Sequence, residues 1–518
     1  MRSIVDAKRV YVVVAACAVV VYLAALWNRF AMDDLYVIAF NPLVHSASGI
    51  WRAFSAPYWP PEYGGKMYRP LIIATFSLDR LVDGSTWFHA VNVFWHAAAT
   101  VVVAALARHW AGLRGALAAG LIFAVHPIHV EAVANVVGRA ELMAALFTML
   151  AVYAALVRES LAWSTIALAF GLLSKENAAV APGLIAWGWM LGLHRPARRR
   201  IVAYAASWTA LAALYGAIRW QVQHPYARWD VVAPVFHSAT WPQVRLTAVA
   251  ALADVVRLLV FPLHLRVDYS PNEYTLVSSP LDGRFWLGVA ALFFWAGVLW
   301  WAWRHHRTVE TFALGWIAIA FLPVANLLFP TGILLAERTL YLPSAGLALA
   351  IGGWIERPSR RFVNLFPPDN RFILVPVKWL PVAVILVAGA IWTAFRVPAW
   401  RDDKAVTMSI LDDSPASYRG PARSGALLQS AGQAGKALAA YQVAARIYDR
   451  DPSVFVGAAD AAFTLGRPAL ADALLIRVDQ LCFQCAGYLY TQAVAARSRG
   501  DVATADSLVA HAKEWEAR

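Results

Sequence analysis

Long apolar segments separated by short loops dominate the chain. Of its 518 residues, 60% are hydrophobic and only 15% are charged, whereas globular domains have roughly 45–50% apolar and about 25% charged residues. A helix needs about 20 apolar residues to cross a bilayer. The candidate spans are 10–29, 86–107, 113–127, 140–157, 161–175, 178–193, 201–220, 284–303, 309–329, 339–355 and 373–396. The sequence therefore predicts an all-α, polytopic membrane protein with about eleven transmembrane helices.

The basic residues predict how these helices are oriented. A net charge of +13 would suit nucleic acid, but the Arg residues gather in short loops, which is the positive-inside pattern of membrane proteins. We expect the N-terminus in the cytoplasm and 243–263 lying at the interface or re-entrant, since it contains Asp254 and Arg257. The predicted cytoplasmic loops then contain Arg108, Arg114, Arg158, Arg195, Arg198, Arg199, Arg200, Arg304, Arg307, Arg357, Arg360, Arg361 and Arg371.

The composition changes after Arg396 to an Ala-rich, soluble pattern. Glycines recur every 34 residues there, and alanines recur at a constant offset from them: Gly432, Gly466 and Gly500, with Ala437, Ala471 and Ala505. This period is typical of tetratricopeptide repeats, in which Ala permits close helix packing. We predict a membrane domain at 1–398, with its first outer loop at 31–85, and a TPR-like α-solenoid at 399–518 on the outer side.

Three cysteines occur in the chain. Cys17 lies in the first apolar segment, where we expect it to be a packing residue. Cys482 and Cys485 form one C-x-x-C motif, which cannot fill a tetrahedral zinc site alone. A local disulfide suits an oxidising compartment, and whether these two cysteines are paired stays open at this point.

Two adjacent carboxylates, Asp33 and Asp34, follow the first apolar segment. Side by side they repel each other, which raises the pKa of one unless a cation or a hydrogen-bond donor lies nearby. They suit a catalytic base, or an anchor for a cationic or metal-bound ligand. The alternative is a solvated helix terminus, where acids are common.

Further polar residues converge on the predicted outer side from separate segments. Arg69, Arg139, Lys175 and Arg338 are the outward cations, and such a set suits a phosphate-linked lipid, because Arg and Lys hold anions. His126, His129 and Glu131 would suit a metal, an interface or phosphate recognition, and the need for a divalent cation stays open. The expected supporting residues are His126, His129, Glu131, Glu141, Glu176, Glu337 and Tyr341.

Several blocks, in order along 30–345, carry a resemblance to a known family. They are Asp33-Asp34 with Asn41-Pro42, Tyr68-Arg69-Pro70-Leu71 with Thr75-Phe76-Ser77-Leu78-Asp79, Phe88-His89-Ala90-Val91-Asn92 with His96, His126-Pro127-Ile128-His129-Val130-Glu131-Ala132-Val133, Val137-Gly138-Arg139-Ala140-Glu141-Leu142, Ser174-Lys175-Glu176, and Glu337-Arg338-Thr339-Leu340-Tyr341-Leu342-Pro343-Ser344. Together with the repeat tail, they resemble the TMTC family of membrane O-mannosyltransferases.

The resemblance implies a glycosyltransferase of the GT-C class. Such an enzyme takes a sugar, here mannose or another hexose, from a polyprenyl-phosphate donor at the outer membrane face and transfers it to a hydroxyl acceptor, such as protein Ser or Thr or a glycolipid. It implies acceptor-side chemistry for Asp33 and Asp34, one of which would be the base. On physical grounds, the four cations Arg69, Arg139, Lys175 and Arg338 are the candidates to stabilise the leaving donor phosphate. The repeat domain would hold the protein acceptor.

Two other functions compete with this interpretation. A transporter or flippase for an anionic lipid-linked sugar would place ionisable groups at mid-membrane and commonly has inverted repeats. A non-catalytic assembly protein would use its repeats to bind envelope partners. The charges lie mainly at the outer ends of the apolar segments, which favours the transferase.

Overall fold

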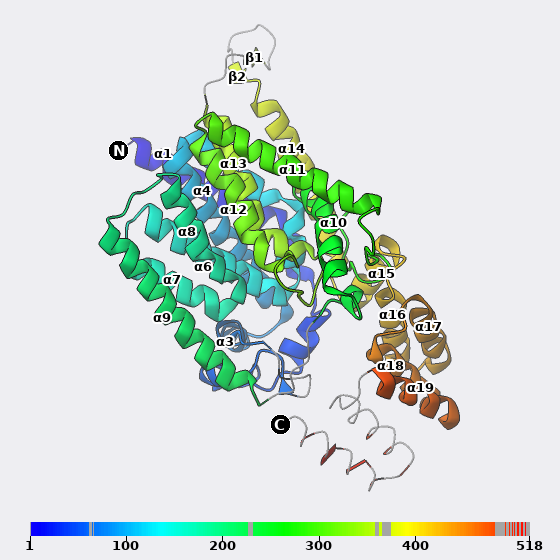
Figure 1. Ribbon diagram of the computed structural model, residues 1–518. Helices are drawn as coiled ribbons and strands as arrows, with labels where there is room; N and C mark the ends of the chain where they lie inside the picture. The colour runs from blue at the N-terminus through cyan, green and yellow to red at the C-terminus, as the bar shows by residue number, and fades with distance from the viewer. Residues whose placement is uncertain are drawn as a thin grey trace.

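The computed structural model describes residues 2–61, 65, 67–225, 232–357, 362–364 and 374–481, and single positions between 493 and 513. The predicted all-helical class is confirmed: helices dominate the described residues (Figure 1). They are accompanied by one small antiparallel pair, β1 (Phe362–Asn364) and β2 (Leu374–Pro376). Cys482 and Cys485 lie outside the described residues.

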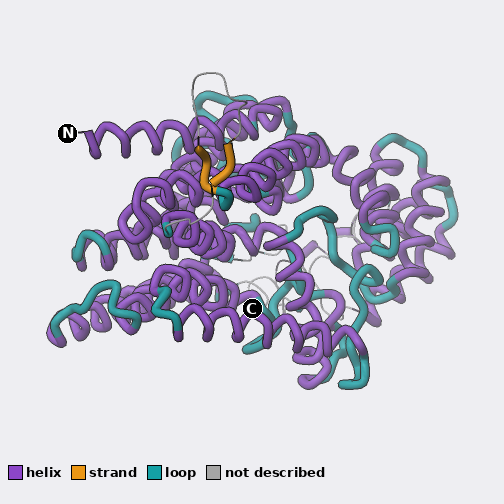
Figure 2. Tube along the Cα trace, turned by 90° about the horizontal axis from the view of Figure 1, so that it is seen from above, coloured by secondary structure: helices purple, strands orange, loops and turns teal. Residues whose placement is uncertain are grey.

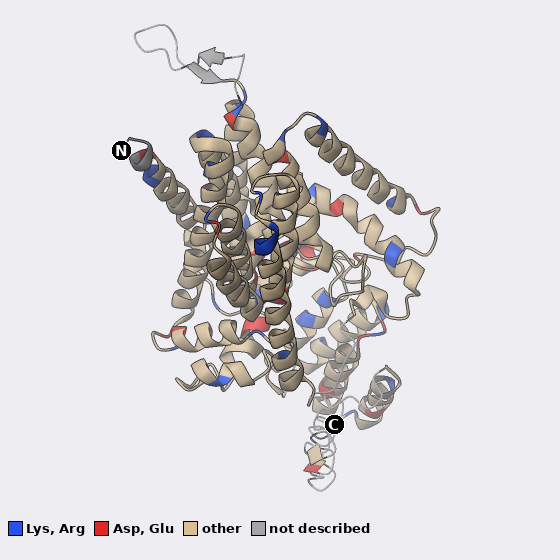
Figure 3. Cartoon of the chain, turned by 60° about the vertical axis from the view of Figure 1, so that its left-hand side comes forward, with Lys and Arg blue, Asp and Glu red and all other residues tan. Residues whose placement is uncertain are grey.

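Among the described residues, five helical segments are long and apolar enough to cross a membrane: Ser85–Val125, Val136–Leu156, Arg198–Gln223, Gly283–Arg304 and Trp379–Trp400. Three shorter apolar helical segments accompany them: Pro70–Asp79, Leu161–Ser174 and Thr308–Val324. These helices suggest association with a membrane, whereas the number of eleven spans stays a prediction. Figure 3 shows charged residues mainly near helix ends and in loops, while the flanks of the bundle are largely uncharged.

Each predicted span contains a helix, but the span 373–396 was predicted to begin too early: Leu374–Pro376 forms β2, and α14 begins at Trp379. The helices before residue 400 are α1 (Arg2–Val21), α2 (Gly49–Arg52), α3 (Pro70–Asp79), α4 (Ser85–Val125), α5 (Val130–Ala134), α6 (Arg139–Leu156), α7 (Leu161–Ser174), α8 (Ala181–Met190), α9 (Arg198–Gln223), α10 (Trp241–Val260), α11 (Gly283–Arg304), α12 (Thr308–Phe321), α13 (Tyr341–Glu356) and α14 (Trp379–Arg396). The segment 309–329 was predicted too long. Its α-helix ends at Phe321, because Pro323 lacks the N–H that would continue the helix.

The element α4 is folded back on itself at Gly112. Gly112 has φ of +71°, outside the helical region, and glycine adopts this conformation without a steric penalty. His96 Nε2 lies 3.2 Å from the carbonyl oxygen of Ala124, whereas 28 residues of straight helix would separate them by about 42 Å. The predicted segments 86–107 and 113–127 are therefore two helices that lie side by side.

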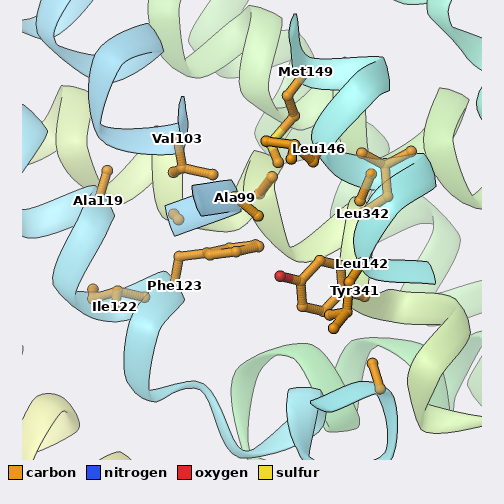
Figure 4. Packing of buried hydrophobic residues seen from close by; sticks show 14 of the residues in the cluster. Ala99, Val103, Ala119, Ile122, Phe123, Leu142, Leu146, Met149, Tyr341 and Leu342 are labelled. Carbon is orange, nitrogen blue, oxygen red and sulfur yellow. The ribbon is translucent and has the colours of Figure 1, made fainter. Parts of the chain in front are cut away.

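The core gathers around α4, α6 and α13. Figure 4 shows the side chains of Phe123 and Tyr341 facing each other within this core. The centroids of their rings are 5.2 Å apart. The second half of α4 can approach α13 closely because Gly115 faces Gly352: a Cβ built on Gly115 would lie 2.8 Å from the Gly352 carbonyl oxygen. Small residues permit such close packing of helices. This rigid core supports the loops at the end of the bundle that carries Asp33.

Within the described residues, five helices follow residue 400 and lie together at one side of the molecule (Figures 1 and 2). They are α15 (Asp403–Asp413), α16 (Arg419–Ser430), α17 (Ala434–Ile447), α18 (Pro452–Thr464) and α19 (Pro468–Leu481). The three periodic glycines have φ between +67° and +80°, and the three periodic alanines are fully buried. The repeated positions thus share conformation and burial, while the assignment to tetratricopeptide repeats and the domain boundary at 398/399 stay predictions.

Candidate active site

Asp34 is an anchor for the loop that follows α1. Its side chain is buried, and its two carboxylate oxygens accept hydrogen bonds from the backbone N–H groups of Val137 (2.8 Å) and Ala31 (3.2 Å). Burial raises the pKa of Asp34 to about 7, although these backbone donors oppose the shift. The carboxylate therefore joins the first loop to the segment before α6 and faces away from solvent.

Asp33 has a different environment from its neighbour. It is half-buried and lines an open pocket with Met32, Glu131, Asn135 and Arg338. Within the described part of the chain, no hydrogen bond or ion pair of the Asp33 carboxylate is found. Of the two adjacent acids, Asp33 is the one that is free to take a proton from a molecule in this pocket.

Arg338 is one of two Arg residues that line the same pocket, and Arg419 is the other. Its backbone N–H donates to Glu131 Oε2 (2.8 Å), and its guanidinium group forms an ion pair with Glu131 Oε1. Burial lowers the pKa of Arg338, but the carboxylates of Glu131, Asp33 and Glu141 outweigh it and raise the pKa above its usual value. The pocket thus combines an unpaired carboxylate with a permanently charged guanidinium group.

Two further ion pairs connect predicted site residues. Arg69 donates two hydrogen bonds to Glu176, from Nε (3.3 Å) and from Nη2 (3.0 Å), and Lys175 pairs with Glu141. Burial raises the pKa of Glu176, but Arg69 and Lys175 lower it to about 2. Arg69 and Lys175 therefore lie in one charged network, each with a carboxylate partner, but outside the residues that line the pocket.

Arg139 is enclosed by protein groups. Its side chain is fully buried and pairs with Asp79 of α3. It also donates to Asn92 Oδ1 (2.9 Å), to the Phe88 carbonyl oxygen (3.0 Å) and to Thr75 Oγ1 (3.3 Å). This set of partners leaves little donor capacity for a phosphate. The placement of Arg139 favours a structural role that joins α3, α4 and α6, in contrast to the phosphate-binding role expected from the sequence.

Replacing Arg139 by Met is expected to lower the free energy of unfolding by about 3–5 kcal/mol, because it leaves Asp79 buried without its partner. Thermal unfolding of the detergent-solubilised protein would measure the loss. The double variant Arg139→Met/Asp79→Asn should recover part of it. A phosphate-binding role for Arg139 would instead give a stable single variant with weakened donor binding.

The predicted histidines are bonded within the protein. His126 Nε2 donates to the Leu259 carbonyl oxygen (3.0 Å), and His129 Nε2 lies 2.7 Å from Ser344 Oγ. Tyr341 is fully buried, and its hydroxyl group bonds to His96 Nδ1 (2.9 Å). Among the described residues, no group of three or more His, Cys, Asp or Glu side chains could hold a metal ion. These residues connect segments of the protein interior through packing and hydrogen bonds, and none of them lines the pocket.

Glu337 is buried next to the pocket. Its Oε1 accepts hydrogen bonds from the backbone N–H of Arg266 and from the hydroxyl group of Tyr269 (2.9 Å). Burial raises the pKa of Glu337 to about 8; Arg396 lowers it, and Glu131 raises it further. Glu337 therefore favours the protonated form at neutral pH, and it orders the loop that leads to Arg338.

The raised pKa of Glu337 predicts that the free energy of unfolding falls as the pH rises. Since its pKa is about 8 in the folded chain against an ordinary 4.5, the folded state holds the proton more tightly. The stabilisation of the folded state by protonated Glu337 is therefore complete below about pH 4.5, and it is lost as the pH rises to about 8. Glu337→Gln keeps both acceptor contacts and should flatten the fall in unfolding temperature across this range. Identical slopes for the two proteins would contradict the assignment.

Other residues in and around the pocket had no role predicted from the sequence. Asp79 and Asn92, which hold Arg139, occur in the motif blocks but carry no predicted role. Arg419 and Trp400 line the pocket from beyond residue 398, and Arg419 bonds to Asp268 (3.4 Å). The sequence around Arg419 and Trp400 does not indicate that they line a pocket, because only the tertiary packing brings them there.

The described residues form a helical bundle with five candidate membrane-spanning helices. A pocket lined by carboxylates and guanidinium groups lies where loops of this bundle meet residues that follow α14. The chain is 28% identical over 447 residues to protein O-mannosyl-transferase TMTC3 of Mus musculus, covering 77% of this chain and 46% of that protein. It is 28% identical over 364 residues to protein O-mannosyl-transferase F38B6.6 of Caenorhabditis elegans, covering 68% of this chain and 52% of that protein.

A third relative, protein O-mannosyl-transferase TMTC4 of Homo sapiens, is 28% identical over 409 residues, which are 65% of this chain and 54% of that protein. These comparisons confirm the resemblance to the TMTC family predicted from the motifs. The chain spans about half the length of the curated relatives it matches. No protein-family model matches it.

Proposed function

We propose that the chain is an integral membrane glycosyltransferase. It moves a sugar, mannose or another hexose, from a polyprenyl-phosphate donor to a hydroxyl group of a protein Ser or Thr. The observation that carries this proposal is the unpaired Asp33 carboxylate in one pocket with the Arg338 guanidinium group. The relatives named protein O-mannosyl-transferases support the same reaction type.

In the proposed reaction, Asp33 takes the proton of the acceptor hydroxyl group as that oxygen attacks C1 of the sugar. The bond between C1 and the donor phosphate oxygen breaks, and its electron pair leaves with the phosphate. Arg338 stabilises the charge that develops on this leaving group. A single displacement of this kind inverts the configuration at C1 and needs one carboxylate, unlike hydrolases that employ two.

We propose different roles for the predicted site residues, and the contacts described above support them. Asp33 is the base, and Asp34 is the anchor that holds its loop. Arg338 is the main phosphate-binding residue. Arg69 and Lys175 contribute to the positive potential from their paired positions, and Arg139 holds the helices together. The polyprenyl chain lies against the apolar flanks of the bundle.

The proposed topology has eleven spans, with the N-terminus in the cytoplasm and the pocket on the outer side. The C-terminal helices form a TPR-like α-solenoid on that side, where they hold the protein acceptor. The constant conformation of Gly432, Gly466 and Gly500 and the burial of Ala437, Ala471 and Ala505 support the repeat assignment.

A transfer assay with the purified full chain in lipid nanodiscs tests this function. Polyprenyl-phosphate mannose and a Ser/Thr-rich peptide should yield a peptide heavier by one hexose in mass spectrometry, with the C1 configuration inverted. GDP-mannose in place of the lipid donor should yield none. Movement of the lipid-linked sugar across vesicles without transfer would support the transporter instead. Repeating the assay with EDTA measures any need for a divalent cation.

A further inference from the structure

The C-terminal helices touch the backbone that leads into Asp33. The backbone N–H of Met32 donates to Asp403 Oδ1 (2.8 Å), and the N–H of Arg29 donates to the Arg401 carbonyl oxygen (2.6 Å). These two contacts join the loop after α1 to the start of α15, more than 370 residues later in the chain. The loop is therefore fixed from outside the bundle as well as from within it.

Met32 adopts a backbone conformation that needs such support. Its φ is +54°, a left-handed conformation that a residue with a side chain adopts only where the surroundings enforce it. The conformation reverses the chain just before Asp33. On the other side of Asp33, the Asp34 carboxylate bonds to Val137 and Ala31. Asp33 thus lies between two clamps, one formed by Asp403 and one by Asp34.

Asp403 is itself held by a charged partner. Arg423 Nη2 of α16 lies 2.5 Å from the same oxygen, Oδ1, that accepts from Met32. An acid in the first turn of a helix ordinarily interacts with the helix dipole, and that alone would explain Asp403. The neighbouring Asp402 already caps α15, since its Oδ1 accepts from the Ala405 N–H (2.8 Å). The Oδ1 atom of Asp403 points instead to Met32 and Arg423.

From these contacts we infer that Asp403 is a positioning residue for the proposed base: its carboxylate holds the Met32 backbone so that the Asp33 side chain faces the pocket. This inference rests on the proposed function of Asp33. It assigns the C-terminal helices a part in catalysis in addition to holding an acceptor. Arg423 connects this clamp to α16, the first helix of the predicted repeats.

Asp403→Ala removes the acceptor for Met32 and should lower kcat by about 100-fold with the KM for donor little changed, because a small misplacement of a catalytic group has this effect. Asp403→Asn keeps an acceptor oxygen and should retain most of kcat. Asp402→Ala is the matched control: it removes the helix cap, lowers the unfolding temperature and should leave kcat unchanged. A purely structural role for Asp403 predicts equal kcat losses for Asp403→Ala and Asp402→Ala.

A second readout does not depend on activity. In a chain whose three cysteines are replaced by Ala, Asp33→Cys should react with a water-soluble methanethiosulfonate at a rate that reports how this position faces the pocket. Asp403→Ala should change that rate several-fold, whereas Asp403→Asn and Asp402→Ala should not. Equal rates in all backgrounds would overturn the inference. If the rates change as expected but Asp33→Asn retains full transfer, the proposed function fails and the positioning contact stands.

Discussion

Replacing Asp33 by Asn is expected to lower kcat for sugar transfer by about 10²–10⁴-fold, the range that a general base contributes. Asn has nearly the same shape but cannot take the acceptor proton. Asp33 has no hydrogen bond or ion pair within the described residues, so little stabilising contact is lost. The unfolding temperature and the KM for donor should change little. Initial rates with polyprenyl-phosphate mannose, measured with thermal unfolding, would check both expectations.

Asp34→Asn is the matched control because it changes the same functional group one residue later. The amide can still accept from Val137, but its NH₂ group would face the N–H of Ala31, so a hydrogen bond is replaced by a repulsive contact. The expected result is a lower unfolding temperature and a smaller loss of kcat than for Asp33→Asn. A larger loss of kcat in a stable Asp34→Asn protein would exchange the roles of the two acids.

The helical architecture could be predicted from the sequence because it follows from local composition. Apolar runs of membrane-spanning length formed helices at every predicted position, and Pro323 shows how one residue shifts a boundary. The reversal at Gly112 agrees with the prediction of separate segments 86–107 and 113–127 on either side of it. These features depend on residues close in the chain, so the apolar pattern predicts where helices occur, although the length rule placed the end of the span 309–329 too late.

The roles of individual site residues could not be predicted in the same way. Asp33 and Asp34 are chemically identical neighbours. Hydrogen bonds from the N–H groups of Val137, 103 residues later, and of Ala31 hold the Asp34 carboxylate in the protein interior. The sequence predicted that Arg139 is an outward-facing cation, yet Asp79 and Asn92 from two other helices enclose its side chain. The types and spacing of charged residues indicate that a site exists, whereas tertiary contacts determine which charged side chains are left to contact a ligand.

Ion pairs between distant segments give the site its shape. Glu131 and Arg338 are 207 residues apart, and Arg69 and Glu176 are 107 residues apart. In each pair the carboxylate orients the cation. The two cations differ in how many side-chain nitrogens their carboxylate partner occupies. Arg69 makes a two-point contact with Glu176. Arg338 lines the pocket and, within the described residues, donates to Glu131 from one guanidinium nitrogen. This difference ranks Arg338 first for contact with the leaving phosphate.

Replacing Arg338 by Gln is accordingly expected to lower kcat by about 10²–10³-fold, the effect of removing one preorganised donor from a developing negative charge. Arg69→Gln should have a smaller effect, because Glu176 already neutralises Arg69. Single-turnover rates with a saturating lipid donor would separate this loss from any change in donor binding.

Arg338→Gln could also lose activity because it destabilises the protein. The variant leaves Glu131 buried without its cation, and breaking such a pair costs about 3–5 kcal/mol. The double variant Glu131→Gln/Arg338→Gln removes both charges and should regain stability. If Arg338 stabilises the leaving phosphate, the double variant stays inactive although it folds. If the Arg338 guanidinium group serves only to neutralise Glu131, transfer returns to near the wild-type rate, and another cation must bind the phosphate, with Arg419 the other Arg that lines the pocket.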